Sequence, residues 1–384
     1  MRFIHTSDWQ IGKTFRFADD ASQVLRDERL DVITRLGELA RSNGASDVLV
    51  AGDVYDVETP SERTLRQPIE RMRAFEAVQW HLIPGNHDAH TPRGPWERLR
   101  RIGEREGFPP NIHLHLAPEP VALADSAAFL LPSVLTRRHV TEDPTAWMDE
   151  APTPEGVMRI GLAHGTVASF GSDAGSTPNR IAPERPALAG LAYLALGDWH
   201  GAVPVSERCG YSGTPEADDF DVGGNGGGTA HVVEIEGPGA PPTVSTYRTG
   251  RFVWHKLDIS VHSAADVDVL EARLRALAPD LGIALVWLRV SGALSLDTRE
   301  AFERRIRHGV GNALRVLRLD DSALLPEPTA ADLAVIDHAG FVRTAADRLA
   351  ARAGDATDPQ RDLAAAALQR FYVLSMLAPG GGRP

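Results

Sequence analysis

The chain has 384 residues, a formal net charge of −12 and a single cysteine, Cys209. One cysteine excludes an internal disulfide framework and fits a reducing compartment. The negative charge argues against a grip on DNA spread over the whole chain, because such a grip needs basic surface. No apolar run reaches the roughly 18 residues of a membrane helix, and the N-terminal MRFIHTSDWQ is typical of a strand rather than a signal peptide. We therefore expect a cytoplasmic protein of two domains and a tail.

The N-terminal part alternates short apolar runs with helical patterns, which is typical of a layered α/β fold. The patterns predict strands at residues 2–6, 46–51 and 77–83, with helices at 20–43 and 59–75 between them. Short strands of a second sheet are expected at 111–116, 121–124 and 127–131, and strands at 158–163 and 191–196 complete the pattern. The run GGNGGG at 223–228 predicts a flexible hairpin loop before a strand at 230–236.

A second unit begins near Arg251. Strands at 254–260, 284–291 and 313–319 alternate with helices at 264–278 and 298–309, which predicts a small βαβαβ domain. Two more helical patterns, at 341–351 and 358–377, either pack on their own domain or dock a partner protein. We expect domains at residues 1–248 and 249–325, followed by a helical region at 326–384.

Five short motifs place metal-binding residue types directly after apolar, strand-like runs. The motifs are Asp8-Trp9-Gln10, Gly52-Asp53-Val54-Tyr55-Asp56, Gly85-Asn86-His87-Asp88, His164-Gly165 and Gly197-Asp198-Trp199-His200. Each alone is an ordinary turn dipeptide or strand-end histidine. Open α/β sheets, however, bind ligands at the carboxyl edge of their strands, so the order of the five motifs predicts one metal site.

This series resembles that of the calcineurin-like metallophosphoesterases, in which D-x-H, G-D-x-x-D, G-N-H-D, a histidine and G-H-x-H follow one another. The phrases RFIHTSDWQIGKTF, LVAGDVYD, IPGNHD and YSGTPEADDF are also similar to those of the SbcD-type DNA repair nuclease subunits. The resemblance covers about the first two thirds of the chain. It implies a four-layer α/β sandwich of two sheets flanked by helices, followed by a small α/β capping domain.

The resemblance also implies two divalent metals and their ligands. Asp53 would bridge the metals, Asp8 and His200 would hold the first, and Asn86 and His164 would hold the second. Two metals about 4 Å apart would bind the phosphate, generate a hydroxide and stabilise an in-line displacement.

Two further residues would serve the reaction. His87 would lie at the scissile phosphate as a general acid or as a stabiliser of the developing charge, and Asp88 would orient it from behind. Asp56 is expected to support the site without binding metal. Trp9 and Tyr55, like Trp96 and Trp199, flank the motifs and could stack bases, although core packing is the expected role of at least two of the four.

Gln10 and Asp198 depart from the family pattern, since each stands where a histidine is expected. Both changes replace an imidazole nitrogen with an oxygen donor. Oxygen-rich sites favour Mn²⁺ or Mg²⁺ over Zn²⁺, so the sequence predicts a manganese-dependent enzyme that uses zinc poorly. The competing interpretation is that the site has decayed.

The leading hypothesis is a DNA exonuclease or endonuclease that hydrolyses phosphodiesters and works with an SMC-like ATPase subunit of the SbcC type. The resemblance also implies a homodimer as one possible state of the protein. The alternatives are a small-molecule phosphodiesterase or phosphatase, and a non-catalytic DNA-binding scaffold with a degenerate metal site. The expected capping domain favours the nuclease.

Overall fold

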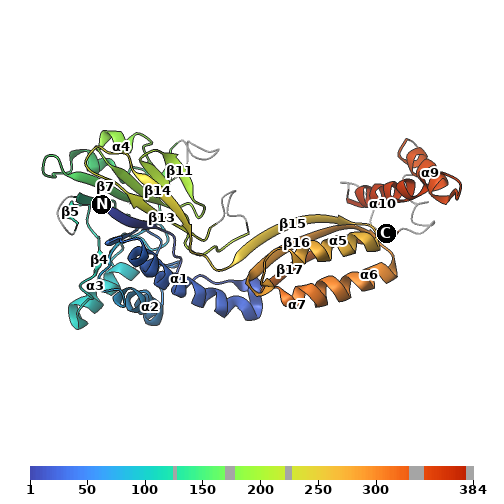
Figure 1. The fold of residues 1–384 in the computed structure, drawn as a ribbon, viewed down its shortest axis with the longest axis horizontal. Helices are drawn as coiled ribbons and strands as arrows, with labels where there is room; N and C mark the ends of the chain where they lie inside the picture. Colours follow the sequence, from blue (N-terminus) through green and yellow to red (C-terminus); the bar gives the residue numbers. More distant parts are fainter. Residues whose placement is uncertain (124–127, 169–177, 221–226, 328–340, 378–384) are drawn as a thin grey trace. The chain divides into compact units, whose positions relative to one another are not determined.

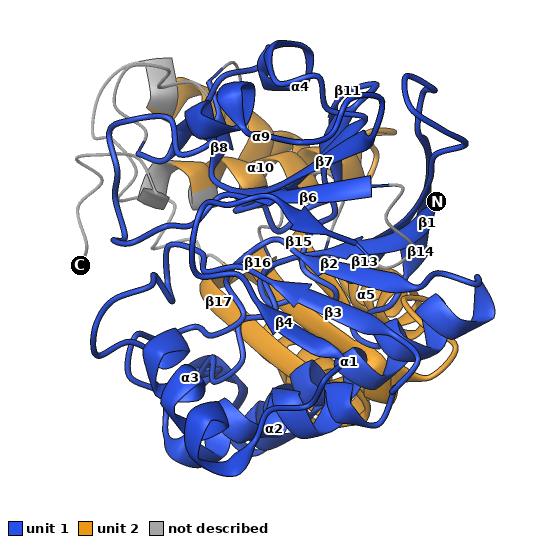
Figure 2. Cartoon of the chain, turned by 90° about the vertical axis from the view of Figure 1, so that its left-hand side faces the viewer, with its two compact units in different colours: residues 1–252 blue, residues 253–384 orange. Residues whose placement is uncertain are grey.

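The computed structural model describes residues 1–123, 128–168, 178–220, 227–327 and 341–377. These residues fall into two compact units, Met1–Phe252 and Val253–Pro384, coloured separately in Figure 2. The predicted glycine-rich loop lies largely outside the described residues. None of the described helices is both long and apolar enough to cross a membrane.

The first unit is built on two six-stranded sheets (Figure 1). The first sheet has the order β14-β13-β1-β2-β3-β4, and the second has the order β11-β12-β10-β7-β6-β5. The strands of the first sheet are β1 (Arg2–Thr6), β2 (Asp47–Val50), β3 (Gln79–Leu82), β4 (Ile112–Leu114), β13 (Thr229–Glu234) and β14 (Thr243–Arg248). Those of the second are β5 (Val121–Ala122), β6 (Ala128–Pro132), β7 (Met158–His164), β10 (Tyr193–Gly197), β11 (Val203–Ser206) and β12 (Cys209–Tyr211).

Helices cover the outer faces of both sheets, so the unit has four layers. The helices and the remaining short elements are η1 (Arg16–Ala21), α1 (Ser22–Ser42), α2 (Glu62–Arg73), α3 (Pro95–Glu106), η2 (Ala146–Glu150), α4 (Arg185–Leu188) and the small sheet of β8 (Thr166–Val167) with β9 (Arg180–Ile181). In Figure 2 the layers run from α2 at the bottom to α4 at the top. The predicted four-layer sandwich is confirmed.

Alternation along the strands sends side chains into different layers. Val48 and Val50 of β2 pack against helix residues such as Ile33, whereas Leu49 between them packs against the second sheet. The far face of the second sheet packs against η2 and α4 through residues such as Met148. Because both faces of β2 are covered, this strand reads in the sequence as an apolar run rather than as an alternation.

The position of one strand differs from the expectation. Residues 111–116 were expected in the second sheet, but β4 pairs in parallel with β3 at the edge of the first. The predicted short strands that follow at 121–124 and 127–131 do pair with each other, as β5 and β6 of the second sheet, where they are described.

The second unit contains a parallel three-stranded sheet in the order β15-β16-β17. Its elements are β15 (Val253–Val261), α5 (Ala264–Arg275), η3 (Leu281–Ile283), β16 (Ala284–Leu294), α6 (Leu296–Phe302), the π-helical η4 (Glu303–Val310), α7 (Gly311–Ala313), β17 (Val316–Pro326), α9 (Phe341–Gly354) and α10 (Arg361–Leu377). The predicted βαβαβ order is present, and α5, α6 and η4 share one core with the sheet.

Candidate metal centre

The loops that follow β1 and β2 run side by side and carry Asp8 and Asp53. The amide of Asp8 donates to the carbonyl of Gly52 at 3.0 Å, and the amide of Gln10 donates to that of Asp53 at 3.0 Å. Asp8, Gln10 and Asp53 have φ angles of 54°, 51° and 52°, in the left-handed region that such residues rarely adopt. Strain of this kind persists where the surrounding structure enforces it, typically at functional sites.

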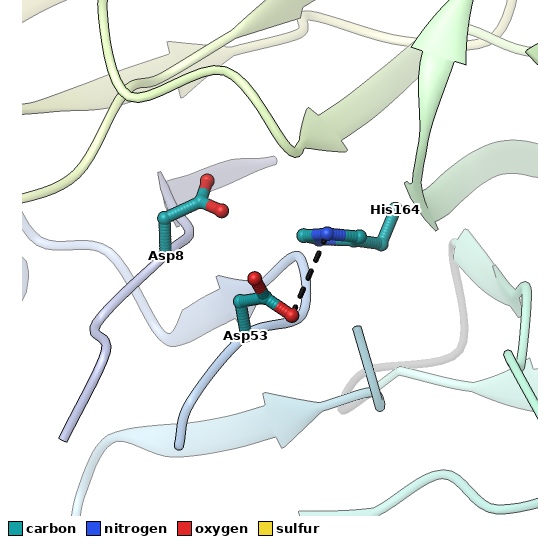
Figure 3. Close-up of side chains that lie close together, drawn as sticks. All are labelled: Asp8, Asp53 and His164. Atoms are coloured by element: carbon teal, nitrogen blue, oxygen red, sulfur yellow. Dashed lines mark ion pairs between the residues drawn. The ribbon is translucent and has the colours of Figure 1, made fainter. Parts of the chain in front are cut away.

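Three predicted ligands converge between the two sheets. Asp8, Asp53 and His164 each place one ligand atom within 4.8 Å of the others (Figure 3). The imidazole Nε2 of His164 lies 3.6 Å from the Oδ1 atom of Asp53. Its Nδ1 donates to the carbonyl of Ala51 at 2.8 Å, so in the neutral ring Nε2 carries the lone pair that a metal would use.

The cluster carries more negative than positive charge, because the carboxylates of Asp8, Asp53 and Asp198 surround His164. Burial raises the pKa of Asp8 to about 6, against the lowering effect of His164 and His200. Burial alone would lower the pKa of His164, but the carboxylates of Asp53, Asp8 and Asp198 outweigh it and raise that pKa to about 9. A bound divalent cation would supply the charge that the protons supply without it.

Two amide side chains bring oxygen atoms to the same place. Gln10 Nε2 donates to Asp53 Oδ2 at 2.8 Å, and Asn86 Nδ2 lies 3.4 Å from Asp198 Oδ1. The NH₂ groups of both side chains therefore already have partners. Their oxygens, Gln10 Oε1 and Asn86 Oδ1, are buried and have no hydrogen-bond partner among the described residues, and the same holds for His164 Nε2. Buried acceptors without partners are rare, and three that belong to predicted ligands are the atoms with which these residues would bind a cation.

Asp198 is held by both of its neighbours in the site. Its amide lies 3.3 and 3.2 Å from the two carboxylate oxygens of Asp8, and its Oδ2 accepts from the Thr166 hydroxyl at 2.5 Å. Its Oδ1 lies 3.7 Å from His164 Nε2. The carboxylate at this unusual position therefore reaches the cluster.

His200 is fixed by Asp218, a residue that no sequence motif singles out. The Nδ1 atom of His200 is bonded to Asp218 Oδ1 at 2.9 Å, which leaves Nε2 on the side of Asp8, 3.9 Å from Oδ1. Asp218 is buried and also accepts from Lys13 at 2.6 Å. Burial would raise the pKa of Asp218, but His200, Arg29 and Lys13 hold it well below its usual range. Asp218 lies in the phrase YSGTPEADDF, where no spacing distinguishes it from the next aspartate.

The environment of His87 differs from the expectation in one respect. Asp88 was predicted to orient the ring, but His87 Nδ1 is bonded to the carbonyl of Asp56 at 3.1 Å. The buried Asp88 carboxylate accepts from the amides of Gly85 at 2.6 Å and Tyr55 at 3.0 Å. Buried backbone donors need acceptors. Asp88 therefore joins the loop of Tyr55 to the loop of Gly85 and does not orient the His87 ring.

Gly85 shows how closely these loops approach. A Cβ atom at this position would lie 2.1 Å from Asp53 Oδ1 and 2.3 Å from the Asp53 amide nitrogen. The absence of a side chain lets the Asn86 loop reach the Asp53 carboxylate, which also accepts from the His87 amide at 2.9 Å.

Three of the aromatic residues flanking the motifs belong to the core. Trp9, Tyr55 and Trp96 are at most 1% exposed and pack in the helix-covered face of the first sheet. They are therefore excluded as base-stacking platforms. The nearby cation Lys13 also faces inward, since it pairs with Asp218.

Seven predicted metal ligands are thus gathered at one edge of the two sheets. They are Asp8, Gln10, Asp53, Asn86, His164, Asp198 and His200. The donor set is rich in oxygen and fits a hard or borderline divalent cation.

Comparisons with known proteins found one family match and several partial relatives. Residues 1–169 match the model of the calcineurin-like phosphoesterase family, a range that ends before Asp198 and His200. The chain is 34% identical over 109 residues to the SbcD chain of the SbcCD nuclease from Rhodobacter capsulatus, and 29% identical over 91 residues to that from Staphylococcus epidermidis. These matches cover 27% and 23% of this chain but only 25% and 23% of the relatives. The solved structure of TT1561 from Thermus thermophilus aligns with 65% of this chain and 98% of its own at 11% identity and a TM-score of 0.41.

Proposed function

We propose that the chain is a two-metal phosphodiesterase that cleaves DNA, since its residues 1–169 match the family model of the calcineurin-like phosphoesterases. The observation that carries the proposal is the convergence of Asp8, Asp53 and His164 with the unpartnered oxygens of Gln10 and Asn86. Both curated relatives are named as subunits of a nuclease, which supports a nucleic acid as the substrate.

The residues divide the work by their position. Asp53 lies between the other ligands and would bridge the metals, with Asp8, Gln10 and His200 on one side. Asn86, His164 and Asp198 would complete the other side. Bound divalent cations would polarise the phosphate and lower the pKa of a water molecule.

His87 is placed to act on the leaving oxygen. Its Nδ1 donates to a backbone carbonyl, so Nε2 is the nitrogen that can carry and deliver a proton. The ring is partly exposed, unlike that of the buried His164. This exposure leaves the His87 ring accessible to a substrate.

The ligand set also underlies the proposed choice of metal. Gln10 and Asp198 contribute oxygen where imidazole nitrogen was expected, and Thr166 holds the Asp198 carboxylate in place. We therefore propose Mn²⁺ as the working metal, with Mg²⁺ as the alternative.

The proposed partner is an SMC-like ATPase subunit, by analogy with the complex named in the relatives. The C-terminal helices α9 and α10 pack on each other, and Leu363 and Leu374 of α10 are 66% and 61% exposed. We propose this helical region as the docking surface for the ATPase, and a homodimer as the form of the nuclease.

Cleavage of linear duplex DNA in Mn²⁺ tests the proposal. The wild-type protein should degrade the duplex, and chelation by EDTA should abolish the reaction. Asp53→Ala should reduce cleavage to background because it removes the carboxylate shared by both metals. The matched control is Glu58→Ala, which removes an exposed carboxylate from the same loop and should leave the rate unchanged.

A chromogenic phosphodiester separates the alternatives. Cleavage of the small ester without cleavage of DNA would point to a small-molecule phosphodiesterase. Inactivity on both substrates in Mn²⁺ and in Mg²⁺, with DNA binding retained, would point to a scaffold with a degenerate site.

A further inference from the structure

Residues 136–139, with the sequence Thr-Arg-Arg-His, form an exposed basic loop in the first unit, which we call the rim loop. Arg137 and Arg138 form no ion pair with any residue in the described ranges. By contrast, Arg100 and Arg101 on α3 both pair with Glu97. Two adjacent and exposed guanidinium groups in the rim loop therefore keep a charge that no described carboxylate pairs with.

The start of the rim loop is tied to the loop of the proposed general acid. The amide of His90 donates to the carbonyl of Leu135 at 2.8 Å. His90 lies three residues after His87, in the same turn-rich segment. The residue before the rim loop is therefore fixed beside one part of the metal centre.

The end of the rim loop is tied to the other part of the centre by Asn179. This residue is 2% exposed; its Nδ2 donates to the carbonyl of Arg138 at 2.9 Å, and its Oδ1 accepts from the amide of Val140 at 2.8 Å. Its own carbonyl accepts from the Thr166 amide at 3.1 Å. Its φ of 55° is left-handed, which asparagine tolerates better than most residues.

The contact between Asn179 and the segment after His164 is very close. A Cβ atom at Gly165 would lie 2.2 Å from the carbonyl oxygen of Asn179, so this approach requires a glycine. Thr166, the next residue, donates to the Asp198 carboxylate. A continuous chain of hydrogen bonds thus leads from the rim loop through Asn179 and Thr166 to a proposed metal ligand.

We propose that the rim loop binds the phosphate groups of the DNA strand next to the scissile bond. The inference rests on the proposed function and names the surface that positions its substrate. Guanidinium groups bind phosphate oxygens through paired N–H donors, and a loop fixed at both ends presents them with little loss of entropy. Arg180 directly follows Asn179 in the chain and is the register partner of Thr166.

The carboxylates closest in sequence to the rim loop do not pair with its two arginines. Asp143 is paired with Arg185 at 2.8 Å and accepts from the Thr145 amide, so it is neutralised within the fold. Glu142 is exposed and three residues beyond the rim loop. The loop therefore keeps a positive charge at the edge of a cluster that is otherwise acidic.

The test is the affinity of the full-length protein for a fluorescein-labelled duplex of about 30 base pairs, measured by anisotropy across a KCl series with Ca²⁺ in place of Mn²⁺. The Arg137→Ala/Arg138→Ala variant should bind about tenfold more weakly. For this variant, the slope of log K against the logarithm of the salt concentration should be less steep by about 1.8, because two phosphate contacts are lost. Arg137→Lys/Arg138→Lys should recover most of the slope.

The matched control is Arg100→Ala/Arg101→Ala, which changes the net charge equally at arginines that already pair with a glutamate. It should change the affinity less than about twofold. Equal losses in the two double variants, or an unchanged salt slope in the rim-loop variant, would overturn the proposal. Wild-type cleavage of DNA and of the chromogenic phosphodiester in Mn²⁺ is scored separately, so a failure of the proposed function is not confused with a failure of the rim loop.

Discussion

At the scale of single residues, most of the candidate metal ligands could be predicted from the sequence. Asp8, Asp53 and His164 stand next to buried strands, and their contacts follow from the rule that parallel strands gather their carboxyl ends at one edge. Asp218 could not be found in this way, because it reaches His200 from a loop position well beyond the end of β12 at Tyr211. Its role depends on a contact between distant parts of the chain.

Asp218→Ala should lower the affinity for Mn²⁺ by about 10- to 100-fold, the range for residues that orient a metal ligand. Without the carboxylate, His200 can rotate or adopt the other tautomer, and Lys13 loses its partner. Isothermal titration with Mn²⁺ measures the change. Against the lowering effect of burial, Asp218 and Asp8 raise the pKa of His200 to about 9 in the metal-free protein. ¹⁵N chemical shifts of the His200 ring should therefore report a lower pKa in Asp218→Ala, which a general loss of stability would not produce.

Asp219→Asn provides the control, since it alters the neighbouring and exposed carboxylate. An unchanged His200 ring signal in Asp218→Ala would show that other contacts orient the histidine.

At the scale of elements, the buried strands β2, β7 and β10 were predictable, whereas the exposed edge strands β11 and β14 were not. β2, β7 and β10 are buried along nearly their whole length and read as apolar runs. β14 is exposed at every position, and β11 contains Pro204 and is half exposed, so neither has a hydrophobic pattern. The placement of β4 failed because an apolar run predicts a strand without indicating its sheet.

The strands β2, β3 and β4 also carry a buried histidine cluster whose charge state should limit stability in acid. His81 is bonded to His115 at 3.0 Å and to Asp47 at 3.1 Å, and its ring stacks on those of His113 and His115. Burial, with the neighbouring His81 and His113, lowers the pKa of His115 to about 3. His115 is therefore expected to remain uncharged in the folded protein at neutral pH.

Below about pH 6.5 the unfolded chain takes up a proton at His115 that the folded protein does not, so the free energy of unfolding should fall as the pH drops from about 6.5 towards 3. Between about pH 7.5 and pH 5 this one group should cost about 2 kcal/mol. His115→Gln should remove that part of the loss. Urea unfolding in EDTA at several pH values measures it, and parallel pH curves for the two proteins would refute this assignment.

At the scale of the whole molecule, the chain has two units with separate hydrophobic cores. Leu257, Val286 and Phe302 belong to a core confined to the second unit, while the candidate metal ligands all belong to the first. The sequence pattern changes at the same place, because a βαβαβ order begins after residue 251.

Separate cores should give two thermal transitions, of which Mn²⁺ raises only one. A ligand that binds the folded state stabilises it by about 2.7 kcal/mol at about 100 times its Kd, and only the unit that holds the site gains this energy. Differential scanning calorimetry with and without Mn²⁺ measures both Tm values. An equal shift of the two transitions would show that the units unfold together.

The most direct test of the metal centre is the number of Mn²⁺ ions bound per chain, measured by isothermal titration calorimetry of the metal-free protein. The converging ligands should hold two Mn²⁺ ions, and Asp53→Ala should lose the binding because both ions share that carboxylate. Zn²⁺ should bind less tightly than at a site with histidine at positions 10 and 198. No Mn²⁺ bound at micromolar concentration, or equal binding to Asp53→Ala, would contradict the two-metal centre.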